Sequence, residues 1–513
     1  FTIILILSTP LLFLFIASYS KHKKEVRRFK ETYKSILWEQ YLTPLPKITI
    51  PFFLQIPFDK IVDEVYKYRH ENSMVAYCLG KLKRVFLFDA SMTHQMMVTK
   101  KNLFEKPEAE YKSLENGFGP NIVSASDSGP YWKKFRKIAE PAFAKDQLSK
   151  LAEVSVDHGS IMMDYISDNT NNFKNSIDVV NVLNQVTIAI LAKVAFGVQI
   201  EFWKKNVQLP KGHNMSLLES ANISAGGGVI YRLIFPKLIQ SFLKRLPFPN
   251  FGKHYSNALD EMNGYLLELL NEKKKNCQSM KEGQQIDNLM NYLMHAQDAN
   301  GNKLTDDEII ANEFIFMFAG YETSSKSLAW VLYELAKRPD LQDLIKKEGD
   351  AIEGRPSLEH YIEGKLTFVK NCIKEGLRLH PPVLFVPKKA IKNLKLVDDN
   401  NVEHKIRKGH LVVAHVEALH HSETYWGKDS LEYNPSRWEK QKIVSGSYLP
   451  FSMGPRKCIG FEFSYIETSL LISHICKHFT FQLEHPLDIP KRANVAVVRG
   501  PEQLKIKFLP RNE

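Results

Sequence analysis

One cysteine near the C-terminal end of the sequence lies in a setting that suits metal binding. Cys458 lies between Gly454 and Gly460, directly ahead of an amphipathic stretch that predicts a helix. The first turn of a helix carries partial positive charge and unpaired N–H groups, which lower the pKa of a cysteine and favour its thiolate. Glycine allows tight turns and lets the backbone approach a flat ligand closely. The pattern predicts that Cys458 is a metal ligand, and the alternative is a small buried cysteine.

Residues 304–338 predict an unusually long helix. The start has the Thr-x-x-Glu spacing of a capping box, from Thr305 to Glu308, and Pro339 ends the helical pattern. With a rise of about 1.5 Å per residue, such a helix is on the order of 50 Å long. We expect this helix to position the polar residues in its middle.

An acid and an alcohol, Glu322 and Thr323, follow an apolar stretch inside this helix. Buried polar groups cost free energy unless they have partners or a chemical task. Ala319 and Thr323 are four residues apart and share a face, and Gly320 beside them leaves room for a ligand to approach the backbone. The pattern therefore indicates chemistry at this point. The alternative for Thr323 is a hydroxyl that bonds back to a carbonyl of its own helix.

Two other residue pairs have helical spacing. Glu375 and Arg378 are three residues apart, so they lie on one helix face as an ion pair, and Pro381 ends that helix. Trp132 and Arg136 are four residues apart and also share a face. Such ion pairs usually contribute little stability, and tryptophans usually pack in cores, so neither pair indicates a function by itself.

Taken together, these motifs resemble those of the cytochrome P450 family. The spacing Phe-x-x-Gly-x-Arg-x-Cys-x-Gly from Phe451 to Gly460 is similar to the family's haem-binding loop. The stretch Ala-Gly-x-Glu-Thr-Ser from Ala319 to Ser324 resembles its oxygen-binding helix, and Glu375 with Arg378 matches its Glu-x-x-Arg hallmark. The matches follow the order of the family along the chain.

The resemblance implies a role for each matching residue. Cys458 would be the axial ligand of haem iron, and Glu322 and Thr323 would be the catalytic pair that delivers protons to dioxygen. Glu375 and Arg378 would form a buried structural network with Arg437. The resemblance also implies that haem contacts come from Trp132, Arg136, Ala319, Gly320, Lys388, Phe451, Arg456 and Gly460, with Trp132, Arg136, Lys388 and Arg456 at the propionates.

One of these positions departs from the family's pattern. After Pro387 the family commonly has arginine near a haem propionate, whereas Lys388 and Lys389 follow here. Lysine keeps the positive charge but loses the two-pronged contact that a guanidinium makes with a carboxylate. We therefore expect Lys388 to act as a single point charge.

The resemblance implies a haem-thiolate monooxygenase that inserts one atom of O₂ into a lipophilic organic substrate and contains haem b. The sequence has no flavin or dinucleotide fingerprint, so electrons would come from NADPH through a separate NADPH-cytochrome P450 reductase, with cytochrome b5 as a further candidate partner. Two alternatives remain: an enzyme that rearranges peroxides without O₂ or reductase, and a haem sensor or carrier without enzymatic activity. Glu322 and Thr323 favour the monooxygenase.

Composition supports a globular protein inside a reducing compartment. The chain has 513 residues, of which 44% are hydrophobic and 25% charged, so it can form a large core. Five scattered cysteines argue against a disulfide framework. The net charge of +12 suggests an anionic neighbour, either a membrane surface or an acidic protein, since no nucleic-acid-binding motif is present.

The first residues predict a membrane anchor, with a cleaved signal peptide as the alternative. Residues 1–20 contain an uncharged stretch, Phe1 to Tyr19, that as a helix would span ~28 Å, close to the hydrocarbon thickness of a bilayer. Basic residues follow this single-pass anchor, and the positive-inside rule places the rest of the chain in the cytosol. The resemblance implies that the membrane is that of the endoplasmic reticulum. Residues 21–57 predict a basic flank and a proline-rich connector, and residues 58–513 predict one haem-containing catalytic domain.

A coarse reading predicts a mainly α fold with a small β portion. We expect a short helix at 60–70, two strands at 74–79 and 84–88 around a turn at Gly80, long helices from 131 to 379, and mixed structure after 383. The apolar segment 229–248 either dips into the membrane or packs in the core.

A histidine and cysteine cluster near the C-terminus resembles a metal site only in composition. His474 and His478 would share a helix face while Cys476 points elsewhere, so we do not expect a closed zinc site there.

Overall fold

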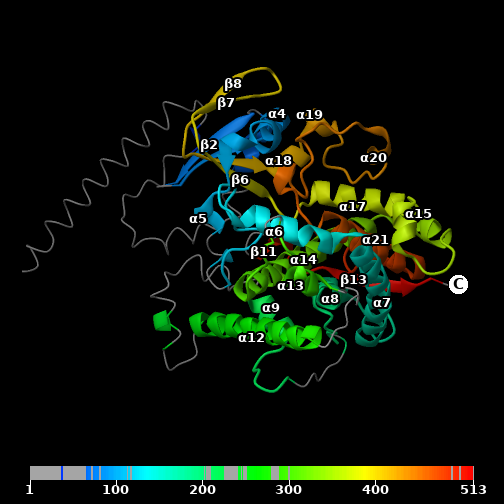
Figure 1. Cartoon of the computed structure of the whole chain (residues 1–513). Coiled ribbons are helices and arrows are strands. Elements are labelled where there is room, and N and C mark those ends of the chain that lie inside the picture. Colours follow the sequence, from blue (N-terminus) through cyan, green and yellow to red (C-terminus); the bar gives the residue numbers. More distant parts are fainter. Residues whose placement is uncertain are drawn as a thin grey trace, which may run out of the picture. The chain divides into compact units, whose positions relative to one another are not determined.

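The fold is that of a computed structural model of the chain (Figure 1). The structure describes residues 36–37, 65–70, 73–79, 82–111, 114–115, 118–201, 203, 209–224, 241–243, 245, 251–278, 288–298, 301–486, 489–495 and 498–511. The predicted anchor at 1–20, nearly all of the predicted connector at 21–57 and most of segment 229–248 lie outside the described residues. Helices predominate over strands, which confirms the expected fold class.

The smaller of two compact units is built around a six-stranded sheet. It comprises the described residues of Phe1–Pro107, Phe385–Leu431 and Ile443–Arg456. The strand order is β1-β2-β3-β9-β6-β4, with bounds β1 Ile36–Leu37, β2 Met74–Leu79, β3 Leu82–Leu87, β9 Leu411–His415, β6 Phe385–Ala390 and β4 Phe104–Glu105. The expected hairpin around Gly80 is confirmed, since β2 and β3 pair antiparallel with Ala76 opposite Val85.

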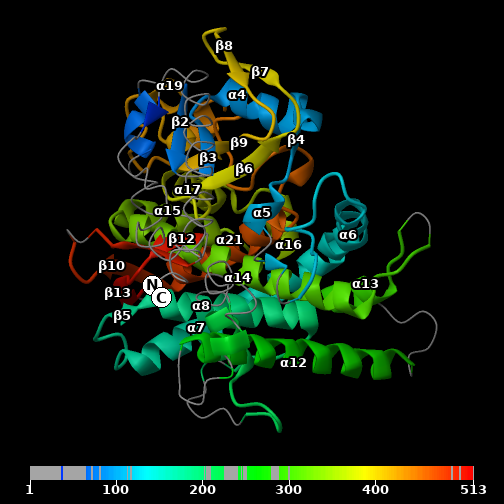
Figure 2. The ribbon, with the colours of Figure 1, turned by 90° about the vertical axis from the view of Figure 1, so that its left-hand side faces the viewer.

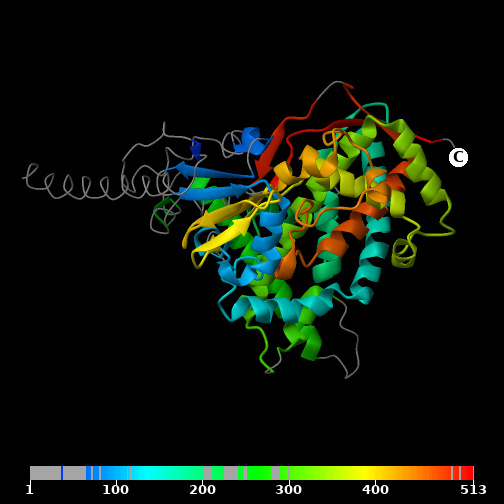
Figure 3. The ribbon, with the colours of Figure 1, turned by 90° about the horizontal axis from the view of Figure 1, so that it is seen from above.

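Strands from distant parts of the sequence meet in this sheet. Parallel pairing of β3 with β9 places Val85 opposite Val412, and antiparallel pairing of β6 with β9 places Lys388 opposite the same residue. Figure 3 shows the blue and yellow strands of the unit side by side. A hairpin and short helices complete it: β7 Leu394–Val397, β8 Glu403–Ile406, η2 Lys67–His70, α4 Ala90–His94, η3 Gln95–Thr99, η4 Lys101–Leu103, α18 Val416–His420, α19 Glu423–Trp426 and η9 Gly454–Arg456.

The larger unit is mostly helical. It comprises the described residues of Glu108–Leu384, Glu432–Lys442 and Lys457–Glu513. Its helices are α5 Glu108–Tyr111, α6 Tyr131–Ala139, η6 Glu140–Phe143, α7 Lys145–Asn169, α8 Val179–Leu191, η7 Ala192–Phe196, α9 Leu217–Ile223, α12 Phe251–Gln278, α13 Leu289–His295, α14 Asp306–Ala336, α15 Pro339–Asp350, α16 Leu358–Ile362, α17 Thr367–Leu379, α20 Arg437–Lys440 and α21 Phe461–His478. Two small sheets join them: β10 Phe479–Leu483, β13 Lys505–Pro510 and β5 Ile177–Asp178 in one, and β11 Arg492–Val495 with β12 Val498–Pro501 in the other.

The long helix predicted at 304–338 is α14, and it passes through the core of this unit. Thr305 caps its start, and both halves of the capping box are present, because Glu308 N donates to Thr305 Oγ1 at 3.3 Å and Thr305 N donates to Glu308 Oε2 at 2.9 Å. In Figures 1 and 2, α14 lies between α17 and α21 on one side and α8 and α12 on the other. Helices on both sides explain why α14 is apolar nearly all round.

One stretch in the described part of the chain has the length and hydropathy of a membrane span. It runs from Val179 to Phe196, through α8 and η7, and 78% of it is buried inside the protein. A stretch so thoroughly covered by neighbouring protein is a core helix of the larger unit, packed along α14.

Candidate functional site

Three neighbouring residues in the middle of α14 have accessible surface although the helix around them is buried. From Ile309 to Ala336 every residue is buried except Ala319, Gly320 and Thr323, which are half-buried. Ala319 and Thr323 share one face, as their four-residue spacing predicted. An accessible patch inside a buried helix indicates a hollow beside the helix at this point.

The cysteine loop also borders open space. Residues 457–464 contain no buried residue, and Cys458 itself has accessible surface. Protein groups nevertheless crowd the thiol, since burial raises the pKa of Cys458 against the opposing effects of the Gly460 N–H and the charges of Arg136 and Lys457. A thiol that is both accessible and crowded lines an internal hollow.

The sequence-based prediction for the acidity of this thiol is wrong for the protein without iron. We expected the helix start to lower the pKa of Cys458, and the Gly460 N–H does act in that direction. Desolvation outweighs it, because the low-dielectric surroundings penalise the charged form. A bound metal cation would reverse the balance, since coordination deprotonates a thiol.

Helix α6 is tied to the cysteine loop by an arginine. Arg136 Nη1 donates to the Lys457 carbonyl oxygen at 2.9 Å, although the two residues are 321 positions apart. Trp132, half-buried on the same helix, packs against the core cluster of this unit. The structure therefore brings Arg136 to the residue next to Cys458, with Trp132 one turn away on the same helix, while the propionate-binding role of the pair stays a prediction.

Helix α21 carries the cysteine loop against the middle of α14. Ser324 Oγ donates to Ser464 Oγ at 3.4 Å, one residue beyond Thr323. A Cβ built on Gly460 would lie 3.7 Å from the Phe143 ring, and that ring packs 5.8 Å from the Phe316 ring of α14. These contacts place the start of α21 and the Ala319–Ser324 segment of α14 in one region of the core.

Thr323 and Glu322 point to different surroundings. Thr323 Oγ1 donates to the Ala319 carbonyl oxygen at 2.7 Å, which is the back-bonded arrangement named as the alternative, and its side chain still borders the hollow. Glu322 is buried, and its Oε1 lies 3.5 Å from Lys326 Nζ. Only Thr323 therefore lies on the accessible face, and the catalytic roles of both residues stay predictions.

The predicted network around Glu375 is present and buried. Arg378 donates to the Glu375 carboxylate from Nε at 2.9 Å and from Nη2 at 2.8 Å, and both side chains have no exposed surface. Arg437 Nε lies 3.3 Å from Glu375 Oε1, which confirms the third partner. Because Arg437 opens α20, the network binds α17 to the segment around α20; its action on the haem loop stays a prediction.

Three predicted cofactor-binding residues belong to the smaller unit. Lys388 lies in β6, Arg456 ends η9, and Phe451 comes three residues before η9 begins. Gly454 begins η9 with a φ of +70°, and a Cβ there would lie 2.3 Å from the Met97 carbonyl oxygen. Both facts require glycine at this position of the motif. The contacts of Lys388, Phe451 and Arg456 with a cofactor stay predictions.

Two buried titratable groups beside the site were not predicted from the sequence. Lys326 pairs with Glu322, and their four-residue helical spacing was the signal that could have revealed it. Glu467 of α21 lies against Ser324, and burial raises its pKa to about 8 although Ser324 lowers it. No sequence signal marks Glu467, because its surroundings come from α14.

The residues around Cys458 fit a haem. In the described part of the chain no three His, Cys, Asp or Glu side chains gather as a metal site, so such side chains alone would not complete the coordination of a metal at Cys458. A single thiolate suits a metal whose other ligands come from a macrocycle. This thiol and the half-buried face of α14 both have accessible surface, and the Arg136 guanidinium beside the loop suits a carboxylate substituent.

Comparisons with known proteins point the same way. The profile of the family described as "Cytochrome P450" matches residues 40–508. The chain is 25% identical to CYP13A1 of Caenorhabditis elegans, named as a cytochrome P450, over 84% of this chain and 86% of that protein. It is 26% identical to a cytokinin hydroxylase of Arabidopsis thaliana (79% and 74%) and 27% identical to cytochrome P450 monooxygenase 124 of Postia placenta (74% and 72%).

Proposed function

Because the chain belongs to the cytochrome P450 family, whose members are haem-thiolate monooxygenases, we propose that it inserts one atom of O₂ into a lipophilic organic substrate. Its electrons come from NADPH through a separate reductase. The observation that supports this reaction most directly is the accessible face of Ala319, Gly320 and Thr323 in an otherwise buried helix. A haem sensor needs no alcohol at that place.

Haem b supplies the redox chemistry when it is bound, with Cys458 as its protein ligand. Burial raises the pKa of Cys458, and the groups around the thiol offset part of this effect. The Gly460 N–H and the positive charges of Arg136 and Lys457 favour the ionised form of Cys458. Arg136 and Trp132 of α6 would hold a propionate, and the hydrogen bond from Arg136 to the Lys457 carbonyl oxygen supports this role. Hydrogen bonds from charged donors to a carboxylate are roughly twice as strong as neutral ones.

Thr323 is the group that can hold a proton at the hollow. Its Oγ1 donates to Ala319 in the resting arrangement, and rotation about its Cα–Cβ bond would redirect the same proton into the hollow. Glu322 lies on the neighbouring, buried face, so it can supply protons to Thr323 only through intervening groups. General acids in such positions typically contribute about 10²- to 10⁴-fold to rate.

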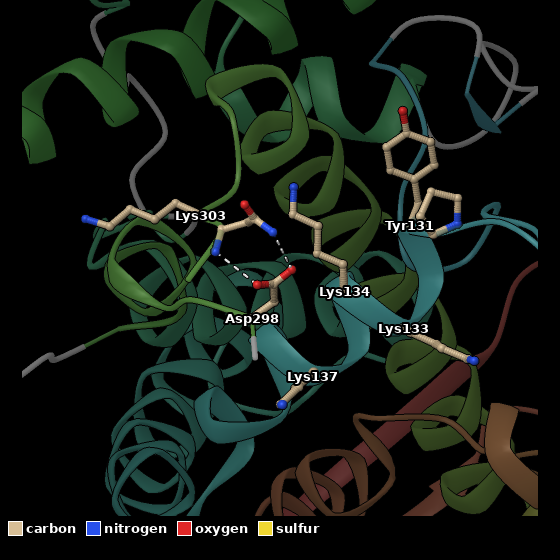
Figure 4. Close-up of a pocket in the computed structure, with 8 residues that line it drawn as sticks. Tyr131, Lys133, Lys134, Lys137, Asp298 and Lys303 are labelled. Carbon is tan, nitrogen blue, oxygen red and sulfur yellow. Dashed lines mark hydrogen bonds between the residues drawn. The ribbon is translucent and has the colours of Figure 1, made fainter. Parts of the chain in front are cut away.

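A basic surface beside the cysteine loop supports an acidic redox partner. Figure 4 shows Lys133, Lys134 and Lys137 of α6, together with Lys303, around one pocket. Lys133 and Lys137 are exposed, and Lys457 next to Cys458 is exposed as well. Lysine clusters steer acidic partners and accelerate their association. We assign this surface to NADPH-cytochrome P450 reductase, with cytochrome b5 as a second candidate.

The anchor at residues 1–20 would hold the protein in the endoplasmic reticulum membrane with the catalytic domain in the cytosol. A membrane location places the enzyme where apolar compounds partition, which favours a lipophilic substrate. Extraction of cell membranes with alkaline carbonate checks the anchor: the full chain should stay in the pellet, whereas a chain lacking residues 1–20 should be released at least in part.

The decisive experiment on the function is spectroscopic and enzymatic. The reduced, CO-bound protein should show the shifted Soret band of a haem-thiolate, and Cys458→Ser should lose it; a normal band in that variant would defeat the ligand assignment. A spin-state screen against sterols, fatty acids and xenobiotics then identifies ligands. Oxygen consumption that depends on NADPH, reductase and ligand confirms a monooxygenase, whereas haem binding without it would indicate a sensor.

A further inference from the structure

A buried lysine accompanies the acid that the proposed function assigns to proton supply. Lys326 Nζ lies 3.5 Å from Glu322 Oε1, and the two side chains are 6% and 4% exposed. The same ammonium lies 3.5 Å from Asn184 Oδ1 of α8. Removing an ammonium from water costs several kcal/mol unless partners replace the solvent. Lys326 is therefore held at this place by Glu322 and Asn184.

Lys326 is also the one cation that the described part of the chain places within ion-pair distance of Glu322. The carboxylate has few other partners: the neighbouring hydroxyl of Tyr321 interacts with it, and its Oε1 has no hydrogen bond within the described structure. The position of the carboxylate thus depends on where the ammonium lies.

A glycine in a distant strand makes room for the stem of this lysine. A Cβ built on Gly500 of β12 would lie 2.3 Å from Lys326 Cδ, 2.7 Å from Cγ and 3.1 Å from Cβ. The φ angle of Gly500 is not positive, so its backbone conformation does not require glycine. Space for the lysine stem is the physical reason for glycine here.

We propose that Gly500 and Lys326 are positioning residues for Glu322. Gly500 leaves the channel in which the Lys326 stem extends, and the ammonium at its end holds the carboxylate in the place from which protons reach Thr323. This inference rests on the proposed function, because it gives Glu322 the role of proton supplier.

The expected consequence is measured as coupling between electron use and product. Each complete turnover uses one O₂, two electrons and two protons, and yields one hydroxylated product and one water. When the protons are misdirected, the same two electrons and two protons leave with O₂ as H₂O₂. Misplacement of the carboxylate should therefore lower the ratio of product to NADPH and raise peroxide.

Four variants distinguish the effect of the Lys326 ammonium charge from that of the space occupied by its side-chain stem. Lys326→Met removes the ammonium and keeps most of the stem, Lys326→Ala removes both, Gly500→Ala adds the methyl group, and Gly500→Ala with Lys326→Ala adds it where the stem is gone. Gly376→Ala is a matched control. Its Cβ, on α17, would lie 2.5 Å from Val331 Cγ2 of α14, the helix that also carries Lys326 and Glu322. All are prepared as haem-loaded protein with reductase and the ligand found by the spin-state screen.

We expect Lys326→Met, Lys326→Ala and Gly500→Ala each to lower the product-to-NADPH ratio by about 3- to 100-fold, the range that misplacement of a catalytic group by up to 1 Å can produce. The double variant should be no worse than Lys326→Ala alone, and Gly376→Ala should couple normally at equal haem content. Normal coupling in Lys326→Met, or full multiplication of the two effects in the double variant, would overturn the proposal.

A second measurement does not depend on turnover. In urea unfolding of the haem-loaded protein, Gly500→Ala should lower the midpoint more in the wild-type background than in the Lys326→Ala background, where the contacts with Cδ and Cγ are gone and only that with Cβ remains. An equal loss in both backgrounds would refute the packing argument.

Glu322→Gln separates the inference from the function on which it rests. If Glu322→Gln uncouples the enzyme while Lys326→Met does not, the positioning role is wrong and the proton role stands. If Glu322→Gln couples normally, the proton role of Glu322 itself is wrong.

Discussion

The buried Glu375 network makes a sharp prediction about stability. Glu375 Oε1 accepts from Arg378 Nη2, from Arg437 Nε and from the Asn434 N–H at 3.1 Å, while Oε2 accepts from Arg378 Nε and from Trp438 Nε1 at 3.1 Å. Glu375→Gln preserves the shape of the side chain. It removes the negative charge and replaces one acceptor oxygen by an NH₂ group that faces donors.

The magnitude follows from burial. Arg378 has no exposed side-chain surface and Arg437 has 5%, so solvent cannot replace the lost carboxylate. Breaking a buried ion pair by removing one partner costs about 3–5 kcal/mol. Since each 1.4 kcal/mol is a factor of ten, the unfolding equilibrium should shift by roughly two to three and a half powers of ten. The total free energy of unfolding of a typical protein is only about 5–15 kcal/mol, so this loss would be a large fraction of it.

Urea unfolding of the haem-loaded protein, followed by the Soret band and by circular dichroism, measures this loss. Asp157→Asn is the control, because Asp157 Oδ1 also pairs with an arginine, Arg355 Nη2 at 2.6 Å, but the side chains are 58% and 51% exposed. Removal of such an exposed pair should cost less than about 1 kcal/mol. A cost for Glu375→Gln as small as that of the control would refute the reasoning that burial gives the network its strength.

Three further variants test other contacts. Thr323→Ala should raise peroxide at the expense of product while haem content and the CO spectrum stay normal, and an unchanged product-to-NADPH ratio would remove Thr323 from proton delivery. Gly454→Ala should lower haem retention during gel filtration, because the methyl group would lie 2.3 Å from the Met97 carbonyl oxygen at a φ of +70°; full retention would contradict this. Burial lowers the pKa of His213, but hydrogen bonds to Glu261 (Nδ1 to Oε2, 2.8 Å) and Glu268 outweigh it, so the folded-state pKa lies above 6.5. These bonds should therefore stabilise the fold fully below about pH 6.5 and less as the pH rises through the folded-state pKa; a stability difference between wild type and His213→Gln that is constant with pH would contradict this.

Several local features were predictable because neighbouring residues determine them. The start of α14 at Asp306 follows from the capping box of Thr305 and Glu308, and its end at Ala336 follows from the nearby Pro339. The hairpin of β2 and β3 follows from alternating side chains around Gly80. The pairing of Glu375 with Arg378 follows from helical spacing alone. In each case the relevant interactions span only a few residues, so the sequence contains the whole cause.

The motif around Cys458 was also recognisable without the structure, because the thiol, the glycines and the following helix lie within a short segment. The acidity of that thiol was not predictable. It depends on how closely other segments surround the sulfur, and burial by those segments raises the pKa that the helix start alone would lower.

What the sequence by itself determined is therefore the chemistry of single segments: a thiol before a helix, an acid and an alcohol inside a long helix, and a Glu–Arg pair that shares a face. Only the tertiary structure decided which distant groups meet them. It brought Arg136 to Lys457, Ser464 to Ser324, and Gly500 to the stem of Lys326. The physical reason is that burial, desolvation and steric space depend on every segment that approaches a side chain, and spacing along one segment contains no information about the others.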